Sequence, residues 1–209
     1  MKILTVDLNT DYADALREAV EILRAGWVIV YPTDTLYGLG ADALSDEAFE
    51  KVCLIKGRDE KKPTHAVFAN MEMAGEYAEI SEVGMKLANA FLPGPLTLIF
   101  NKKPHVTTGI ARDLSTIGVR IPNNEFCAAL SKQFAKPYTT TSANVSGRES
   151  GSTVTEILEQ LGEGARYIDL VIDSGPLSSH VGSTVVDVRD EPHVIREGAI
   201  RADAIKEWR

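Results

Sequence analysis

Apolar side chains recur along the chain with two different periods. Residues 11–25 carry them at three- and four-residue spacing and are followed by Gly26, which predicts a helix that ends at a C-cap glycine. Residues 46–55 repeat this spacing after Ser45, a residue type favoured as an N-cap. The same periodicity predicts three further helices, at residues 82–91, 124–135 and 154–161.

Short apolar runs between these helices predict β-strands. The runs are rich in β-branched and aromatic residues, and several are apolar throughout, which indicates strands buried on both faces of a sheet. Their irregular spacing excludes a regular parallel order. We therefore expect a single α/β domain over residues 1–209, with a twisted sheet of parallel and antiparallel strands and flanking helices. The expected strands lie near residues 3–6, 27–31, 65–69, 96–100, 116–121, 138–141, 168–172, 183–188 and 193–196.

Composition narrows the class of protein further. The 209 residues are 44% hydrophobic and 25% charged, which is typical of a globular domain. The long apolar runs, such as residues 27–31 and 96–100, are far shorter than the roughly 20 residues of a membrane-spanning helix. Asp7 and Asp11 interrupt the region where a secretory signal would have its apolar core. We therefore expect a cytoplasmic protein that makes no contact with a membrane.

Neither the cysteines nor the histidines show the spacing of a metal site. Cys53 and Cys127 lie far apart and form no CxxC pair, so we expect two buried thiols and no disulfide. The four histidines do not form an HExxH pattern. Any metal ion should therefore arrive with a substrate.

Charge is concentrated in one short segment. The formal net charge of −8 disfavours an extended surface for nucleic acid. Residues 51–63, however, contain five basic and two acidic residues. Within them, Lys56, Arg58 and Lys62 combine lysine point charges with a guanidinium that can bind phosphate through two hydrogen bonds. This cluster suits a nucleotide triphosphate, although a solvated charged turn would have the same composition. The chain has no GxxxxGK[ST] phosphate loop, so side chains would have to hold the nucleotide.

Two hydroxyl-rich segments follow predicted strands, where ligands of α/β proteins usually bind. The first, YPTDTLYGLG at residues 31–40, contains Thr35; a structural turn of proline and glycine would look similar. The second, TTTSANVSG at residues 139–147, offers neutral donors and acceptors that suit an amino acid or adenine, and a purely structural loop is the alternative. The absence of a GxSxG elbow argues against a serine hydrolase.

An arginine lies inside an otherwise apolar strand. Arg120 in STIGVRIP requires a partner, which could be an acidic side chain of the protein or the carboxylate of a substrate. Thr116 lies four residues earlier on the same face of the strand. Ser183 and Arg196 again place polar groups in or beside short strands near the end of the chain.

Taken in order, YPTDTLYGLG, KGR with KKP, LPGPLT, TIGVRIP, TSANVSG, GSTVVDV and IREG resemble the successive sequence blocks of the YrdC-like threonylcarbamoyl-AMP synthases. The resemblance extends from about residue 14 to residue 200. It implies a YrdC-like fold with an open, concave, basic groove. It also implies a nucleotidyltransferase that forms threonylcarbamoyl-AMP from L-threonine, bicarbonate or CO₂ and ATP, with Mg²⁺ bound to the ATP and release of pyrophosphate. A separate transferase complex would then use the product to make threonylcarbamoyladenosine in tRNA.

The resemblance assigns roles to single residues. The catalytic candidates are Lys56 and Arg58. The residues expected to bind ATP are Arg58, Lys62, Thr116, Ser142, Asn144, Ser150 and Arg196. The residues expected to bind threonine are Thr35, Arg120, Thr140 and Ser183. The chain departs from the family pattern at Asp59, at Thr64 and at Val67, the last at a frequent histidine position, and TTSAN at residues 140–144 replaces the common APSAN. These departures bear on ATP affinity more than on the class of reaction.

Two alternative functions stay open on the sequence. One is carbamoyl-adenylate chemistry on another substrate, as in the related domain of hydrogenase-maturation proteins, which normally belongs to a much longer chain. The other is a non-catalytic RNA-binding module, for which salt-sensitive RNA binding without ATP consumption is expected. Weak RNA binding could also accompany the enzyme. The additional C-terminal domain of longer family members is not expected in a chain that ends at Arg209.

Overall fold

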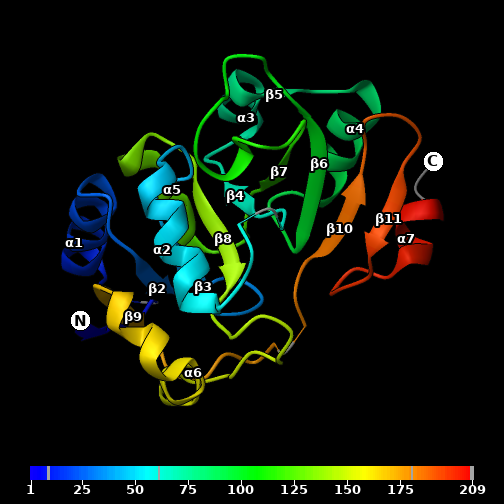
Figure 1. Cartoon of the computed structure of the whole chain (residues 1–209). Helices are drawn as coiled ribbons and strands as arrows, with labels where there is room; N and C mark the ends of the chain where they lie inside the picture. The colour runs from blue at the N-terminus through cyan, green and yellow to red at the C-terminus, as the bar shows by residue number, and fades with distance from the viewer. Residues whose placement is uncertain (9, 61, 180, 208–209) are drawn as a thin grey trace.

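Residues 28–31, which form one strand and the position before it, belong alternately to two separate apolar cores. Val28 and Val30 pack into one core, whereas Ile29 and Tyr31 pack into the other. Because successive side chains of a strand point to opposite faces of the sheet, helices must cover both faces here. The computed structural model, which describes residues 1–8, 10–60, 62–179 and 181–207, shows this arrangement (Figure 1).

The described strands form one mixed sheet in the order β1-β9-β2-β3-β8-β4-β7-β6-β10-β11, with β5 paired to β6. The pairs β1/β9, β2/β9, β4/β7 and β6/β10 are parallel, and the others are antiparallel. The mixed sheet predicted from the sequence is therefore confirmed. The bounds are β1 (Lys2–Thr5), β2 (Ile29–Tyr31), β3 (Gly38–Gly40), β4 (His65–Val67), β5 (Ala78–Glu79), β6 (Leu96–Lys102), β7 (Thr116–Arg120), β8 (Tyr138–Ser142), β9 (Leu170–Asp173), β10 (Thr184–Asp187) and β11 (His193–Arg196).

Side-chain caps fix the ends of several helices. The Ser45 hydroxyl accepts a hydrogen bond from the backbone of Ala48 at the start of α2, as its sequence position predicts. Thr153 and Glu156 form a capping box at the start of α6. The helices are α1 (Ala13–Arg24), α2 (Asp46–Lys56), α3 (Met71–Tyr77), α4 (Glu82–Phe91), α5 (Glu125–Phe134), α6 (Val154–Leu161) and α7 (Ala202–Glu207), with 3₁₀ turns η1 (Gly109–Ala111) and η2 (Gly162–Tyr167). None of the helices in the described ranges has the length and apolarity needed to cross a bilayer.

The two faces of the sheet are covered unequally. Helices α2, α3, α4 and α6 share one core with the strands of both halves of the sheet. On the other face, α1 and α5 pack on each other and on β2, β9, β8 and the end of β4. The described side chains of this second core include none from β6, β7 or β10. The polar residues that these strands place on that face are therefore available to a ligand.

The sequence missed several short elements. It did not predict α3, α7 or β5, and it treated residues 32–40, after the expected strand at 27–31, as a loop. Instead, β3 (Gly38–Gly40) pairs antiparallel with β2, so the segment is two strands joined by a short turn. A Cβ atom at Gly38 would lie 2.9 Å from the ring of Tyr31, which explains why a strand here is built from glycine, a residue otherwise rare in strands.

The contact between α4 and β6 leaves no room for an extra methyl group. A Cβ atom at Gly84 would lie 2.2 Å from the ring of Phe100, whereas one at Gly75 in α3 would have its nearest neighbour at 3.9 Å. We expect Gly84→Ala to lower the free energy of unfolding by about 1–3 kcal/mol through overpacking. The matched control Gly75→Ala should raise it by up to ~1 kcal/mol, because alanine favours a helix. Urea denaturation measures both changes, and equal effects of the two variants would contradict this packing.

Candidate active site

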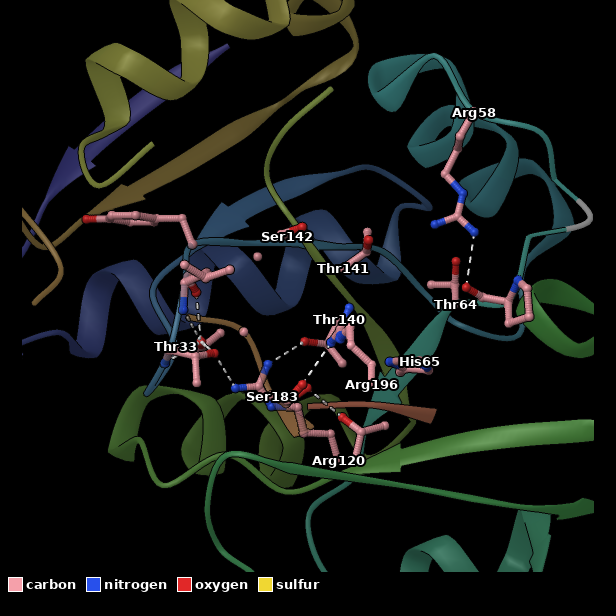
Figure 2. A pocket seen from close by; sticks show the side chains of 17 residues that line it. Thr33, Arg58, Thr64, His65, Arg120, Thr140, Thr141, Ser142, Ser183 and Arg196 are labelled. Carbon is pink, nitrogen blue, oxygen red and sulfur yellow. Dashed lines mark hydrogen bonds between the residues drawn. The ribbon is translucent and has the colours of Figure 1, made fainter. Parts of the chain in front are cut away.

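A polar hollow of about 160 Å³ lies on the uncovered face of the sheet (Figure 2). Strand register explains why its residues meet. Arg120 of β7 lies opposite Thr97 of β6, and His65 of β4 lies opposite Thr140 of β8. Because one face collects every second residue of each strand, these side chains share a floor. The lining consists of Thr33, Thr35, Leu36, Tyr37, Gly38, Arg58, Pro63, Thr64, His65, Thr97, Arg120, Thr140, Thr141, Ser142, Gly182, Ser183 and Arg196.

Arg120 forms a buried ion pair with Asp34. Its Nη2 atom lies 2.6 Å from an Asp34 carboxylate oxygen, and the two side chains are only 8% and 9% exposed. The same Nη2 atom also donates to the Thr35 hydroxyl at 2.6 Å, and Nη1 lies 3.5 Å from the Thr140 hydroxyl. The backbone of Asn123 donates to the second Asp34 oxygen at 3.1 Å. The sequence left open whether Arg120 pairs with an acidic side chain of the protein or with a substrate carboxylate. In the structure, its partner is the acidic side chain of Asp34.

A hydroxyl holds the loop that carries Asp34 and Thr35. The Thr33 Oγ1 atom accepts hydrogen bonds from the backbone of Thr35 at 3.1 Å and of Leu36 at 3.2 Å, and it donates to the Leu36 carbonyl at 2.7 Å. This local pattern is a threonine turn, which competes with regular structure and ends the strand. It fixes the direction in which Asp34 and Thr35 face Arg120.

Lys56 does not line the hollow but supports one of its walls. The side chain is buried, and its ammonium donates to the Ser142 carbonyl at 2.5 Å, the Asn144 carbonyl at 2.9 Å and the Asn144 side-chain oxygen at 3.1 Å. Its own carbonyl accepts from the backbone of Ser146 at 2.9 Å. Burial, assisted by the charge of Arg58, lowers the pKa of Lys56 to about 7. Lys56 therefore positions residues 142–146, and its expected action on phosphate stays a prediction.

Arg58 reaches the hollow from the segment after α2. Gly57 ends this helix in the left-handed region, at φ 57°. Because the chain changes direction there, Arg58 faces the hollow, although Lys56, two residues earlier, points into the protein. The Arg58 Nη2 atom donates to the Lys62 carbonyl and to the Pro63 carbonyl, the latter at 3.1 Å. Its Nε atom is buried without a hydrogen-bond partner among the described residues. Burial lowers the pKa of Arg58. Lys62 is exposed and is not part of the lining.

Arg196 enters from β11 and links the hollow to a second one. Its Nη2 atom donates to the Ser183 carbonyl at 2.9 Å, and the Ser183 hydroxyl lies 2.9 Å from that of Thr97. Partial burial lowers the pKa of Arg196. The second hollow, of about 430 Å³, shares Arg196 and Ser142 with the first and adds Asn144 and Ser150. Two neighbouring compartments therefore meet at Arg196 and Ser142.

One predicted residue lies away from both hollows. Thr116 is at the start of β7, opposite Asn101, whereas Arg120 is at its end. Four residues of a strand span about 13 Å, so the two side chains share a face without sharing a site. The role of Thr116 in ATP binding stays a prediction.

From the sequence, no binding role was predicted for the lining residues His65 and Thr97. Thr33 and Asp34 were noted only as part of the segment at residues 31–40, and Thr64 only as a departure from the family pattern. Thr97 could have been found, because it is a lone hydroxyl in the apolar run at residues 96–100, as Arg120 is a lone charge in its own strand. Thr64 is buried, and its hydroxyl has no hydrogen-bond partner among the described residues. Burial and the charges of three arginines lower the pKa of His65 to about 3, so its imidazole is neutral at pH 7.

The fold and the site define a class of α/β proteins with a polar hollow on the open face of a mixed sheet, lined by arginines from three separate segments of the chain. A family model named for Sua5, YciO and YrdC, with the description "telomere recombination", matches residues 21–198. The chain belongs to this family.

Relatives with curated names support this membership. The threonylcarbamoyl-AMP synthase of Mus musculus is 35% identical over 86% of this chain and 65% of its own length. A protein of Methanocaldococcus jannaschii, provisionally given the same name, is 40% identical over 86% of this chain and 83% of its own. The chain spans about two thirds or less of several relatives, including 56% of the Pyrococcus abyssi synthase.

Solved structures share the fold. The crystal structure of Pyrococcus abyssi Sua5 complexed with L-threonine superposes with a TM-score of 0.89 at 32% identity, covering 100% of this chain and 61% of that one. Escherichia coli YciO superposes with a TM-score of 0.83 at 28% identity, covering 98% of both chains. The likeness to full-length HypF, at 23% identity and 29% of that chain, shows the fold alone.

The Arg120–Asp34 pair should contribute strongly to stability, because removal of one partner leaves a buried charge uncompensated. We expect Asp34→Ala to lower the free energy of unfolding by about 3–5 kcal/mol. The double variant Asp34→Ala with Arg120→Met should recover most of this loss. Urea denaturation of the single and double variants measures the coupling. Additive losses would show that the two side chains do not stabilise each other.

The lowered pKa of Lys56 predicts a pH dependence of stability. Between pH 7 and about 10.4, the unfolded chain binds a proton at Lys56 more tightly than the folded chain does. The free energy of unfolding of the wild type should therefore rise with pH in this range relative to that of Lys56→Met. Parallel stability curves of the two proteins between pH 7 and 10 would contradict the shift.

Proposed function

We propose that this chain is a nucleotidyltransferase that forms threonylcarbamoyl-AMP from L-threonine, bicarbonate or CO₂ and ATP, with release of pyrophosphate. The observation that carries the proposal is the convergence of Arg58, Arg120 and Arg196, from three separate segments of the chain, on one hydroxyl-lined hollow. The names of the relatives and the threonine-bound Sua5 structure support the same reaction.

The hydroxyl-rich side of the hollow is proposed to bind threonine. The hydroxyls of Thr35 and Thr140 contact the Arg120 guanidinium. Ser183 lies on the adjoining wall (Figure 2). Because Asp34 already balances the charge of Arg120, this side is nearly neutral and suits a zwitterionic amino acid. Its carboxylate would share Arg120 with the Thr140 hydroxyl.

The side with the other two arginines is proposed to bind ATP. Arg58 and Arg196 carry no carboxylate partner among the described ion pairs, so they can bind phosphate oxygens. Ser142, shared by both hollows, marks the passage to Asn144 and Ser150 in the second hollow, which would take the nucleoside. The open, basic groove expected from the family resemblance stays a prediction.

In the proposed reaction, the neutral amine of threonine takes up CO₂ to form a carbamate. A carbamate oxygen then attacks the α-phosphate of ATP and displaces pyrophosphate. The chain contributes alignment of the two reactants and positive charge next to the phosphates, mainly from Arg58 and Arg196. Mg²⁺ is proposed to arrive bound to the ATP phosphates, where it would neutralise part of their charge. No covalent intermediate with the protein is required.

The product is a labile mixed anhydride that a second enzyme must consume. We propose a tRNA-modifying transferase complex as the downstream partner, in keeping with the tRNA role of the family. A cytoplasmic location and weak RNA binding belong to the same proposal.

A substrate-omission assay tests the function. Pyrophosphate release should require ATP, Mg²⁺, L-threonine and bicarbonate together. Arg58→Ala should lower kcat/KM for ATP by roughly 10- to 100-fold, because a hydrogen bond to a charged group contributes about 1.5–3 kcal/mol. The control Arg17→Ala, at an exposed position on α1, should keep full activity. Pyrophosphate release without threonine, or full activity of Arg58→Ala, would contradict the proposal.

A further inference from the structure

His65 is a titratable lining residue of the hollow for which the proposed function has no role so far. It lies on β4 between Gly118 of β7 and Thr140 of β8. A Cβ atom at Gly118 would lie 2.4 Å from the imidazole, so the missing side chain there creates the space that the ring occupies. Among the described residues, none forms a hydrogen bond with the imidazole, and the ring lines the hollow, where a ligand can reach it.

The ring lies where the two proposed subsites meet. Thr140, directly opposite His65, belongs to the amino-acid side, and Arg120 is two residues beyond Gly118 on the neighbouring strand. Arg196 belongs to the phosphate side, and its charge acts on His65 more strongly than those of Arg120 and Arg58. Figure 2 shows His65 beside Arg196. The carbamate must bridge the amine of threonine and the α-phosphate, which places it next to this imidazole.

The chemistry of the lining leaves one group that can accept a proton at neutral pH. The three arginines stay protonated, and Tyr37, whose pKa is raised by burial, donates its hydroxyl to the Gly175 carbonyl at 2.7 Å. The other described lining side chains are hydroxyls or apolar groups. The imidazole of His65 is neutral and has a free lone pair.

The charges around the ring tune its basicity. Burial is the main cause of the lowered pKa of His65, and the charges of Arg196 of β11, Arg120 of β7 and Arg58 after α2 lower it further. Asp34 compensates the charge of Arg120. Phosphates bound to Arg58 and Arg196 would neutralise the two remaining positive charges. The ring therefore becomes a stronger base when ATP occupies the site, at the stage when the amine has to lose its proton.

We infer that His65 is the general base that accepts the amine proton when threonine is carboxylated, an inference that rests on the proposed function. The amine lone pair forms the new C–N bond to CO₂, and one C=O electron pair moves to oxygen. The N–H bond breaks, and its proton passes to the free ring nitrogen of His65. The products are the carbamate anion and an imidazolium ion, so atoms and charge balance.

Two single-turnover reactions test this role. His65→Gln keeps a polar side chain but cannot accept the proton, and His105→Gln changes an exposed histidine as a control. Forward formation of threonylcarbamoyl-AMP should slow by roughly 100-fold or more in His65→Gln, because general bases contribute about 10²–10⁴ in rate. The reverse formation of ATP from supplied threonylcarbamoyl-AMP and pyrophosphate should keep its rate, because it does not involve proton transfer at nitrogen. His105→Gln should match the wild type in both directions.

Each result separates the alternatives. Equal slowing of both directions in His65→Gln would show a structural role and overturn the inference, as would an unchanged forward rate. Both of these leave the proposed function intact. A wild-type protein that forms no threonylcarbamoyl-AMP would instead overturn the proposed function and, with it, the role of His65.

Discussion

A guanidinium buried in a β-sheet requires a carboxylate, and this requirement organises the whole site. Arg120 lies at the end of β7, and its partner Asp34 comes from the turn between β2 and β3. The ion pair therefore holds that turn over the end of a strand that is distant from it in the sequence. It also cancels the charge of Arg120, so that the positive charge left to the hollow is that of Arg58 and Arg196. One side of the hollow is thus nearly neutral, and the other is cationic.

The position of the hollow follows from the way in which the helices cover the sheet. Helices α1 and α5 pack on β2, β8 and β9 and leave the same face of β6, β7 and β10 open. On the covered half, the side chains of this face are apolar, for example Ile29 and Leu170. On the open half, they include Thr97 and Arg120, which would be unfavourable under a helix without hydrogen-bond partners. The strands are therefore apolar on both faces only where both faces are covered.

The segment after α2 shows how local backbone geometry separates two adjacent charges. Lys56 belongs to the last turn of the helix and donates to carbonyl groups of the loop after β8. The left-handed conformation of Gly57 then redirects the chain, and Arg58 faces the hollow. One cation therefore supports the loop that carries Ser142, and the other lines the hollow. A residue with a side chain at position 57 would disfavour this change of direction.

Local patterns in the sequence were sufficient to predict the longer helices, most of the strands and the family. The three- and four-residue spacing predicted α1, α2, α4, α5 and α6, because a helix buries a single stripe of side chains. Arg120 was recognised as a candidate site residue because it is a lone charge in an apolar strand. The order of the motifs along the chain indicated the family. β3 was missed because its glycines carry no strand signal. Short elements such as α7 were missed because they contain too few residues to show a period.

Only the tertiary structure decided which side chains meet. The sequence could not choose between an acidic side chain and a substrate as the partner of Arg120. The strand order, which lets the turn between β2 and β3 reach the end of β7, is a long-range property. The two-residue period of a strand placed Thr116 on the same face as Arg120, but the two residues lie at opposite ends of β7. His65 became a candidate only through its register with Gly118 and Thr140. Residue types and local periods are written in the chain, whereas distances across a sheet depend on how the whole chain packs.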